Sequence, residues 1–392
     1  MSALSHYQLP SPEEEVWRYS RIAELDLDAY APADDSPVSG GVPAAIDAAL
    51  ATVPVRGVTI VTVNGRVVHL DVAAPGVDVV TDPEDALGIA MAEPTDVFAE
   101  MNDDFTTAPV VIRVAPGATV EAPIVIGRWV DEAGVATFPR TVVVAGEDSR
   151  AQVVEYSASD DVVAFMAPVT ELSVGRAARL GYLNAQNLGL KTWQVASQVS
   201  TVDVDATLTS VCAAFGGDYA RQRTDCRLVG RGASGNLRAV YFGEAEQMLD
   251  FRTFQDHAAP DTMSNLLFKG AVGGHSRSVY TGMIRVRKNA HGTNAFQTNR
   301  NIKLSDGAWA ESVPNLEIEN NDVRCSHASA VGPIDEEQRF YLESRGVPTP
   351  IAERLIVTGF FDEVLSKLPV AGVASALRTL VSGKLDRQVA TP

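Results

Sequence analysis

The sequence is poor in cysteine, in positive charge and in long apolar runs. Its three cysteines, an odd number far apart among 392 residues, argue against a disulfide framework. Fifty acidic residues stand against 32 basic ones, and the net charge of −18 argues against binding to nucleic acids or to anionic membranes. No apolar run approaches the roughly 20 residues of a membrane-spanning helix. Because the first residues also lack the pattern of a secretory signal peptide, we expect a cytoplasmic protein.

The first hundred residues combine helical signals with one hairpin. A Ser-Pro-Glu-Glu run supplies an N-cap, a first-turn proline and a capping-box glutamate, which predicts a helix over 11–27. Residues 31–43 are typical of a linker. Two alternating apolar runs flank an Asn-Gly pair within 58–70, which predicts a β-hairpin with a two-residue turn. Two short helices are expected near 83–91 and 94–103.

From about residue 107 to residue 330, short apolar runs alternate with Gly, Asp and Asn, and no helical period is visible. Small-residue corners recur at steps of 31, 28, 29 and 27 residues. This period, with strands between tight corners, predicts a β-solenoid in which each coil buries its inner face on its neighbours. A β-sandwich with similar strand spacing is the alternative. The corners are Gly117-Ala118, Asp148-Ser149, Arg176-Ala177, Asp205-Ala206 and Gly232-Ala233, with Gly274-His275 and Gly307-Ala308 as candidates for continuing the series.

After Gly332-Pro333 the pattern becomes helical again. Helices are expected over 335–345, from Thr349 to about Leu368, and over 370–384. The apolar stripe on these helices is most often internal core, although a mixed aromatic and aliphatic face can also dock another protein.

Cys325 and His327 are the strongest candidates for chemistry. In an extended strand, residues i and i+2 point to the same side, so the thiol and the imidazole would share a face. Both are metal ligands, but two ligands cannot close a four-coordinate site, so further donors would have to come from elsewhere in the chain or from another chain. The alternative is a half-buried pair without a metal role.

The remaining histidines and cysteines point to structural roles. His257, His275 and His291 lie among Gly, Ser and Asn, so we expect surface or turn positions. Cys212 and Cys226 are expected to be buried thiols on opposite sides of a coil.

Two catalytic classes find little support. No phosphate-binding Gly-x-x-x-x-Gly-Lys-Ser/Thr loop is present, so the chain does not carry its own ATPase. A β-helical carbohydrate-active enzyme needs carboxylates that converge on one face, and here they are scattered, so it stays a remote alternative.

A collinear run near the end of the repeat region resembles the SufB/SufD family of iron–sulfur cluster assembly proteins. Within that family, Cys-Ser-His followed by a small residue is similar to the SufD branch, whereas SufB typically has Cys-Glu-His there. The opening Glu14-Glu15-Val16-Trp17-Arg18-Tyr19 is also similar to that branch. The run comprises residues 297–307, Pro314-Asn315-Leu316-Glu317-Ile318, Asp322-Val323-Arg324-Cys325-Ser326-His327, Val331-Gly332-Pro333-Ile334-Asp335 and Phe340-Tyr341-Leu342-Glu343-Ser344-Arg345-Gly346-Val347.

The resemblance implies a mainly β fold, a right-handed parallel β-helix over 107–330. A helical region with a β-hairpin (1–106) precedes it and a helical domain (331–392) follows. It implies a non-catalytic scaffold subunit that pairs with SufB through the β-helix and recruits the SufC ATPase through the C-terminal helices. The residues expected to face SufC are Phe340, Tyr341, Leu342, Leu355, Phe360, Phe361 and Leu365.

The resemblance also implies a transient iron–sulfur cluster at the SufB interface, with His327 and Cys325 as contributing ligands. A structural partner without ligands of its own is the alternative. A reduced flavin accompanies some complexes of the family, but no flavin motif is visible, and no cofactor is expected in the isolated chain. When the sister subunit is absent, we expect the chain to be able to form a homodimer through its exposed coil edges.

Overall fold

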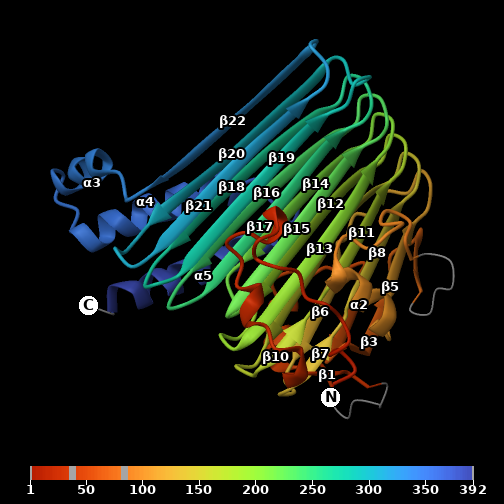
Figure 1. The fold of residues 1–392 in the computed structure, drawn as a ribbon, viewed down its shortest axis with the longest axis horizontal. Helices are drawn as coiled ribbons and strands as arrows, with labels where there is room; N and C mark the ends of the chain where they lie inside the picture. The colour runs from red at the N-terminus through yellow and green to blue at the C-terminus, as the bar shows by residue number, and fades with distance from the viewer. Residues whose placement is uncertain (1, 35–40, 81–86, 391–392) are drawn as a thin grey trace.

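The structure is a computed structural model that describes residues 2–34, 41–80 and 87–390. Most of the chain winds into a β-solenoid whose strands run side by side along one axis (Figure 1). The strands form a twelve-stranded and a ten-stranded sheet, and successive coils pair in parallel. Helices lie toward both ends of the chain. The predicted mainly β solenoid is therefore confirmed.

The chain alternates between the two sheets, so each coil contributes a strand to each of them. The twelve-stranded sheet contains β1 (Ala31–Pro32), β4 (Val77–Val80), β5 (Val110–Val114), β7 (Val135–Thr137), β8 (Arg140–Ala145), β10 (Ala164–Met166), β11 (Val169–Val174), β13 (Thr192–Val202), β15 (Tyr219–Leu228), β17 (Met248–His257), β19 (Arg277–Val286) and β21 (Trp309–Ile318). The ten-stranded sheet contains β2 (Val58–Val63), β3 (Arg66–Val72), β6 (Ile124–Val130), β9 (Arg150–Ser159), β12 (Arg179–Asn187), β14 (Thr207–Ala214), β16 (Ser234–Gly243), β18 (Met263–Val272), β20 (Thr293–Lys303) and β22 (Val323–Gly332).

The predicted corners lie between strands of the twelve-stranded sheet and the next strands of the ten-stranded sheet. One residue in each has a positive φ, namely Gly117, Asp148, Ala177, Asp205 and Gly232. Each of these residues donates its backbone N–H to a carbonyl of the next coil, at 2.8 to 3.2 Å. The corners thus hold the coils in register.

The same series continues at Asp261 and Gly292, which also have positive φ. The expected continuation at Gly274 and Gly307 is wrong. Both glycines lie at the opposite corners, where the chain passes from the ten-stranded to the twelve-stranded sheet. The sequence pattern misled because both kinds of corner favour small residues.

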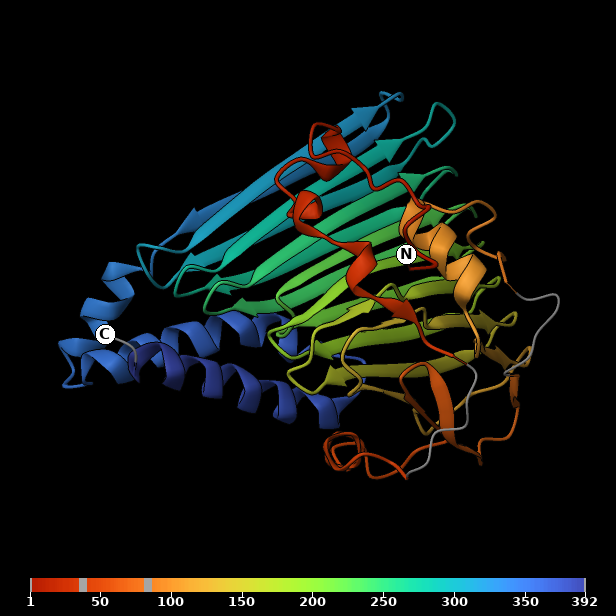
Figure 2. The same ribbon diagram turned by 60° about the horizontal axis from the view of Figure 1, so that its bottom comes forward.

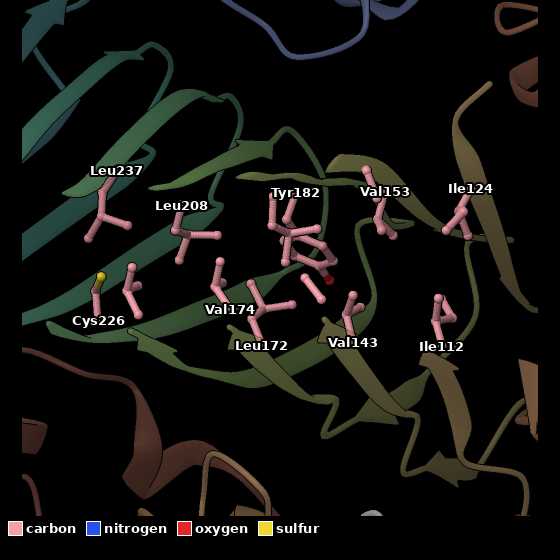
Figure 3. Packing of buried hydrophobic residues seen from close by; sticks show 14 of the residues in the cluster. Ile112, Ile124, Val143, Val153, Leu172, Val174, Tyr182, Leu208, Cys226 and Leu237 are labelled. Atoms are coloured by element: carbon pink, nitrogen blue, oxygen red, sulfur yellow. The ribbon is translucent and has the colours of Figure 1, made fainter. Parts of the chain in front are cut away.

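Alternate residues of each strand point into the space between the two sheets, which we call the lumen. Figure 3 shows apolar side chains of successive coils stacked there, among them Val143, Leu172 and Leu208. These side chains are 0% exposed, and their burial supplies the main driving force for stacking.

The N-terminal segment does not form the helix predicted over 11–27. It contains only three 3₁₀ turns, η1 (Glu15–Trp17), η2 (Ile22–Glu24) and η3 (Leu27–Ala29), and it lies along the face of the twelve-stranded sheet (Figure 2). The carbonyls of Val16 and Arg18 accept hydrogen bonds from Arg221 and Arg252 of that sheet, at 2.8 and 2.7 Å. These hydrogen bonds to the sheet take the place of the backbone hydrogen bonds of a helix. In this conformation Trp17 is also buried against the sheet, which further favours it.

The rest of the N-terminal region matches the prediction in part. The β2–β3 hairpin is confirmed, and it is antiparallel. Helix α1 (Ala44–Leu50) follows the predicted linker, of which residues 35–40 lie outside the described residues. The helix expected near 94–103 is α2 (Val97–Phe105). The helix expected near 83–91 is wrong for residues 87–91, which form turns and bends, and its earlier part lies outside the described residues.

The three predicted C-terminal helices are present as α3 (Glu336–Glu343), α4 (Thr349–Leu365) and α5 (Ala371–Ala390). The side chain of Asp335 caps α3, and Gly346, at φ +84°, lies between α3 and α4. Helices α4 and α5 pack on the outer face of the ten-stranded sheet, on the side away from the N-terminal segment (Figure 2). None of the described helices is both long enough and apolar enough to cross a membrane.

Candidate functional site

The last coil leaves one end of the lumen open. Strands β21 and β22 are the final strands of the two sheets, and each pairs with a strand on one side only. Their inner faces, which would be covered in the middle of the solenoid, are half-buried or exposed in the described structure. Exposed apolar side chains there include Leu316, Ile318 and Val331. We call this surface, formed by the inner faces and free edges of β21 and β22, the open end.

Cys325 and His327 both lie on β22 and face the open end. Their register partners on β20 are Ala295 and Gln297, whose side chains are 0% and 1% exposed inside the lumen. Cys325 is half-buried and packs on a small apolar cluster that includes Ile284. His327 is exposed. The shared face predicted from their spacing is therefore present, at a position that another protein chain can cover.

The Cys325 thiol is held in its protonated form by its surroundings. Burial raises its pKa, and a hydrogen bond with the backbone of Ala295 opposes this shift only in part. A thiol binds iron as the thiolate, so metal binding here has to displace the proton. A nearby cation would favour that step.

The described residues do not complete a metal site. They contain no group of three or more His, Cys, Asp and Glu side chains that could hold a metal ion. Two acidic residues near the open end are engaged elsewhere, since Glu317 and Glu319 pair with Arg285 at 3.6 and 3.1 Å. Within the described part of the chain, Cys325 and His327 therefore remain a pair of candidate ligands.

Polar side chains lie directly beneath the open end. Asn299 and Asn301 on β20 are buried in the lumen and hydrogen-bond with each other and with Tyr241. This is a local network rather than a ladder of identical amides along the coils. Gln297 and Ser312 also face the lumen, and their side-chain polar atoms have no partner among the described residues. Sequence reasoning missed both, although Gln297 is two residues from Asn299 and therefore on the same strand face.

His257 is not at the surface or in a turn, as its neighbours in sequence suggested. It lies on β17 with a fully buried side chain, and its two ring nitrogens contact the hydroxyls of Thr262 and Ser264 at 2.8 Å each. Burial lowers its pKa to about 4, so the ring is neutral at physiological pH. His275 and His291 are exposed at corners, as expected.

Cys212 and Cys226 lie in opposite sheets, as predicted, on β14 and β15. Cys226 is buried as expected, whereas Cys212 is half-buried by its exposed surface. Burial raises the pKa of each thiol to about 12. Both are therefore protonated at neutral pH, which makes them poor ligands.

The helical residues expected to face SufC divide into three groups. Phe340, Tyr341 and Leu355 are exposed by 71, 54 and 52%. Leu342 and Phe360 are half-buried and line a groove of about 990 Å³ between α3, α4 and the ten-stranded sheet. The remaining two, Phe361 and Leu365, are 0 and 1% exposed and belong to the core under α4, so their expected role at a surface is wrong.

Comparison with known proteins connects this geometry to one family. A family model for the SufBD core domain of SUF system FeS cluster assembly matches residues 128–360, which include the open end, α3 and most of α4. An iron–sulfur cluster assembly SufBD family protein of Mycobacterium tuberculosis is 40% identical over 224 residues, 55% of this chain and 56% of the relative. The chain thus spans about half the length of this mycobacterial relative.

Two further relatives align over more of the chain. The iron–sulfur cluster assembly protein SufD of Escherichia coli is 26% identical over 386 residues, 96% of this chain and 89% of the relative. The chloroplastic protein ABCI7 of Arabidopsis thaliana is 28% identical over 302 residues, 74% of this chain and 63% of the relative. The resemblance to SufD therefore extends over almost the whole chain.

Proposed function

The chain belongs to the SufBD family of iron–sulfur cluster assembly proteins, and we propose that it is a SufD-like, non-catalytic scaffold subunit of a cytoplasmic Suf complex. In this proposal it pairs with SufB through the β-helix of residues 107–330. It recruits the SufC ATPase through the helices of residues 331–392. A transient iron–sulfur cluster forms at the SufB interface and is the cargo of the complex.

The observation that carries the proposal is the position of Cys325 and His327 at the open end. Two soft-to-borderline donors lie on the inner face of the last strand, at a surface that also presents free strand edges and exposed apolar side chains. A second solenoid placed against this end would cover the apolar residues and bring further donors to the thiol and the imidazole. The low count of ligands in this chain is then a consequence of sharing the site.

The histidine is tested in the reconstituted complex with SufB and SufC under anaerobic conditions. We expect His327→Ala to lower the yield of bound cluster at least threefold, measured by iron and sulfide content and by absorbance, while the subunits still co-elute. His275→Ala, an exposed corner histidine, is the matched control and should leave the yield unchanged. A full yield from His327→Ala would support the alternative of a structural partner without ligands.

The helical surface is tested separately. We expect Phe340→Asp to weaken co-purification of SufC at least tenfold, because a charge replaces an exposed aromatic side chain at the proposed contact. The thermal unfolding midpoint should stay unchanged. Leu365→Asp is the contrast, since a charge in the core under α4 should unfold the helical domain. Normal SufC binding by a folded Phe340→Asp variant would contradict the assignment of this surface.

A further inference from the structure

Gln297 is a buried amide without a hydrogen-bond partner. Its side chain is 1% exposed, and neither Oε1 nor Nε2 is paired with any described residue. Leaving a buried polar group unpaired destabilises a protein by about 1–3 kcal/mol. Native structures contain few such groups, and those that they keep often serve function. The position of this amide therefore calls for a physical reason.

The two other inward-facing amides that follow on β20, Asn299 and Asn301, are satisfied. Asn301 donates to Asn299 at 2.9 Å, Asn299 donates to the Tyr241 hydroxyl at 2.9 Å, and that hydroxyl donates to Asn301 at 2.8 Å. The lumen can thus pair an amide on β20 with internal partners. Of the three amides Gln297, Asn299 and Asn301, it is Gln297, in register with His327, that has no hydrogen-bond partner among the described residues.

The chain also reserves space for this amide. A Cβ atom added at Gly282 on β19 would collide with the Gln297 amide and with the Tyr280 hydroxyl. Gly282 does not have a positive φ, so its backbone conformation does not require glycine. The Gln297 side chain occupies the space that a side chain at position 282 would otherwise fill. The absence of a side chain at Gly282 therefore accommodates the glutamine.

The nearest candidate to use the amide is His327. The two residues are register partners on adjacent parallel strands, about 4.8 Å apart at the backbone, and both face inward. The His327 ring has no hydrogen-bond partner among the described residues. A histidine that binds metal through one ring nitrogen nearly always donates the N–H of the other to an acceptor, and this bond fixes its tautomer and orientation.

We propose that Gln297 is a positioning residue for His327, with Oε1 accepting the N–H of the imidazole so that the other ring nitrogen faces the open end. The purpose of this bond rests on the proposed function, because it prepares the ring as a ligand. The bond requires the Gln297 side chain to turn from the space beside Gly282 toward β22. It gives the unpaired amide its partner.

The tautomer of His327 tests the proposal in the isolated full-length chain. With ring nitrogens labelled by ¹⁵N, at a mildly alkaline pH where histidine rings are neutral, NMR reports the ratio of the two tautomers, and the His327→Ala spectrum assigns the signal. We expect Gln297→Leu to change this ratio at least threefold. Gln297→Glu, which keeps an acceptor oxygen at the same place, should restore the wild-type preference.

Gln255 provides the matched control. It is also a fully buried glutamine with both amide atoms unpaired, but it lies on β17, in register with Cys226 and Ile284. Gln255→Leu should leave the His327 tautomer ratio unchanged. Equal ratios in the wild type, Gln297→Leu and Gln255→Leu would overturn the proposal. Urea unfolding of each variant identifies any loss of folding, and we expect none for Gln297→Leu, because leucine needs no hydrogen bond in the lumen and the exposed His327 ring can bond to water instead.

The cluster assay separates this proposal from the one on which it rests. If both are correct, Gln297→Leu lowers the cluster yield at least threefold in the reconstituted complex, whereas Gln255→Leu does not. If His327→Ala leaves the yield intact, the proposed function of His327 fails. The tautomer ratio of the isolated chain still decides whether Gln297 holds the ring.

Discussion

The two ends of the lumen differ in how they treat polar groups and in whether they are covered. At the N-terminal end, antiparallel strands β3 and β4 form the outer edges, and Ala74, Val77 and Val79 pack over the apolar core. At the C-terminal end, β21 and β22 remain open and no described strand or helix covers them. A solenoid needs a cap to protect its last coil. Among the described residues, the C-terminal end is thus the uncovered one.

The polar interior follows the same contrast. Near the N-terminal end, Arg128 and Glu155 form an ion pair inside the lumen, and Thr141 and Tyr182 hydrogen-bond to it. Near the C-terminal end, the inward-facing Gln297 and Ser312 stay unpaired. The charge pair thus has its partners within the chain. Gln255, buried on β17 in the middle of the solenoid, is also unpaired, so an unpaired amide is not confined to the open end. What distinguishes Gln297 and Ser312 is that they lie on or next to strands with a free edge.

The largest effect is expected from breaking the ion pair at the closed end. Arg128→Met leaves the Glu155 carboxylate in the lumen without its counter-charge, which should lower the free energy of unfolding by about 3–5 kcal/mol. Urea denaturation followed by circular dichroism measures this loss. Arg285→Met, which breaks an exposed pair at the open end, should cost less than about 1 kcal/mol.

A second variant checks the cause of that loss. Adding Glu155→Leu to Arg128→Met removes the isolated charge, so most of the lost stability should return. If Arg128→Met and Arg285→Met lower the free energy of unfolding by similar small amounts, burial does not make the Arg128–Glu155 pair more important than an exposed ion pair.

The sequence predicted the solenoid well because its period depends on local corner chemistry. Residues such as Asp148 and Gly232 adopt a positive φ that few residue types tolerate, so the corners are visible in the sequence. The three C-terminal helices were equally visible through their caps and apolar stripes. The absence of an N-terminal helix could not be predicted from the local sequence. Arg221 and Arg252, about two hundred residues away, donate hydrogen bonds to the backbone carbonyls of that segment.

The candidate site was predicted in part for a similar reason. The shared face of Cys325 and His327 follows from strand alternation alone. The unpaired state of Gln297 depends on which coil is the last and on the space above Gly282, and neither is encoded locally. The burial of His257, Phe361 and Leu365 likewise depends on which elements pack against them.

An intermediate effect is expected from the pH dependence of His257, whose ring is buried and hydrogen-bonded on β17. Its pKa of about 4 lies below the ordinary 6.5, so between these pH values the unfolded chain binds more protons than the folded one. Stability therefore falls as the pH falls through this window, by about 2–3 kcal/mol between pH 7.5 and pH 4.5. Above about pH 7.5 the contribution is constant, because the ring is then neutral in both the folded and the unfolded chain.

His257→Gln should remove this share of the acid sensitivity, measured as the difference between urea unfolding free energies at the two pH values. His275→Gln, at an exposed corner, is the control and should retain the wild-type difference. If both variants show the wild-type pH dependence, the buried ring does not resist protonation as its surroundings indicate.

The smallest effect is expected from filling the space beneath the open end. This change tests whether the region around Gly282 is tightly packed in the isolated chain. Gly282→Ala places a methyl group against the Gln297 amide and the Tyr280 hydroxyl, so we expect a loss of about 1–3 kcal/mol in the free energy of unfolding. Gly332→Ala, at the end of β22 with open space around its Cα, should be neutral within about 0.5 kcal/mol. If Gly282→Ala is also neutral, the Gln297 side chain moves aside without cost, and the two ends of the lumen then differ in rigidity as well as in cover. A loss in the expected range means that the open end is pre-shaped, because the position of the amide is then already fixed within the isolated chain.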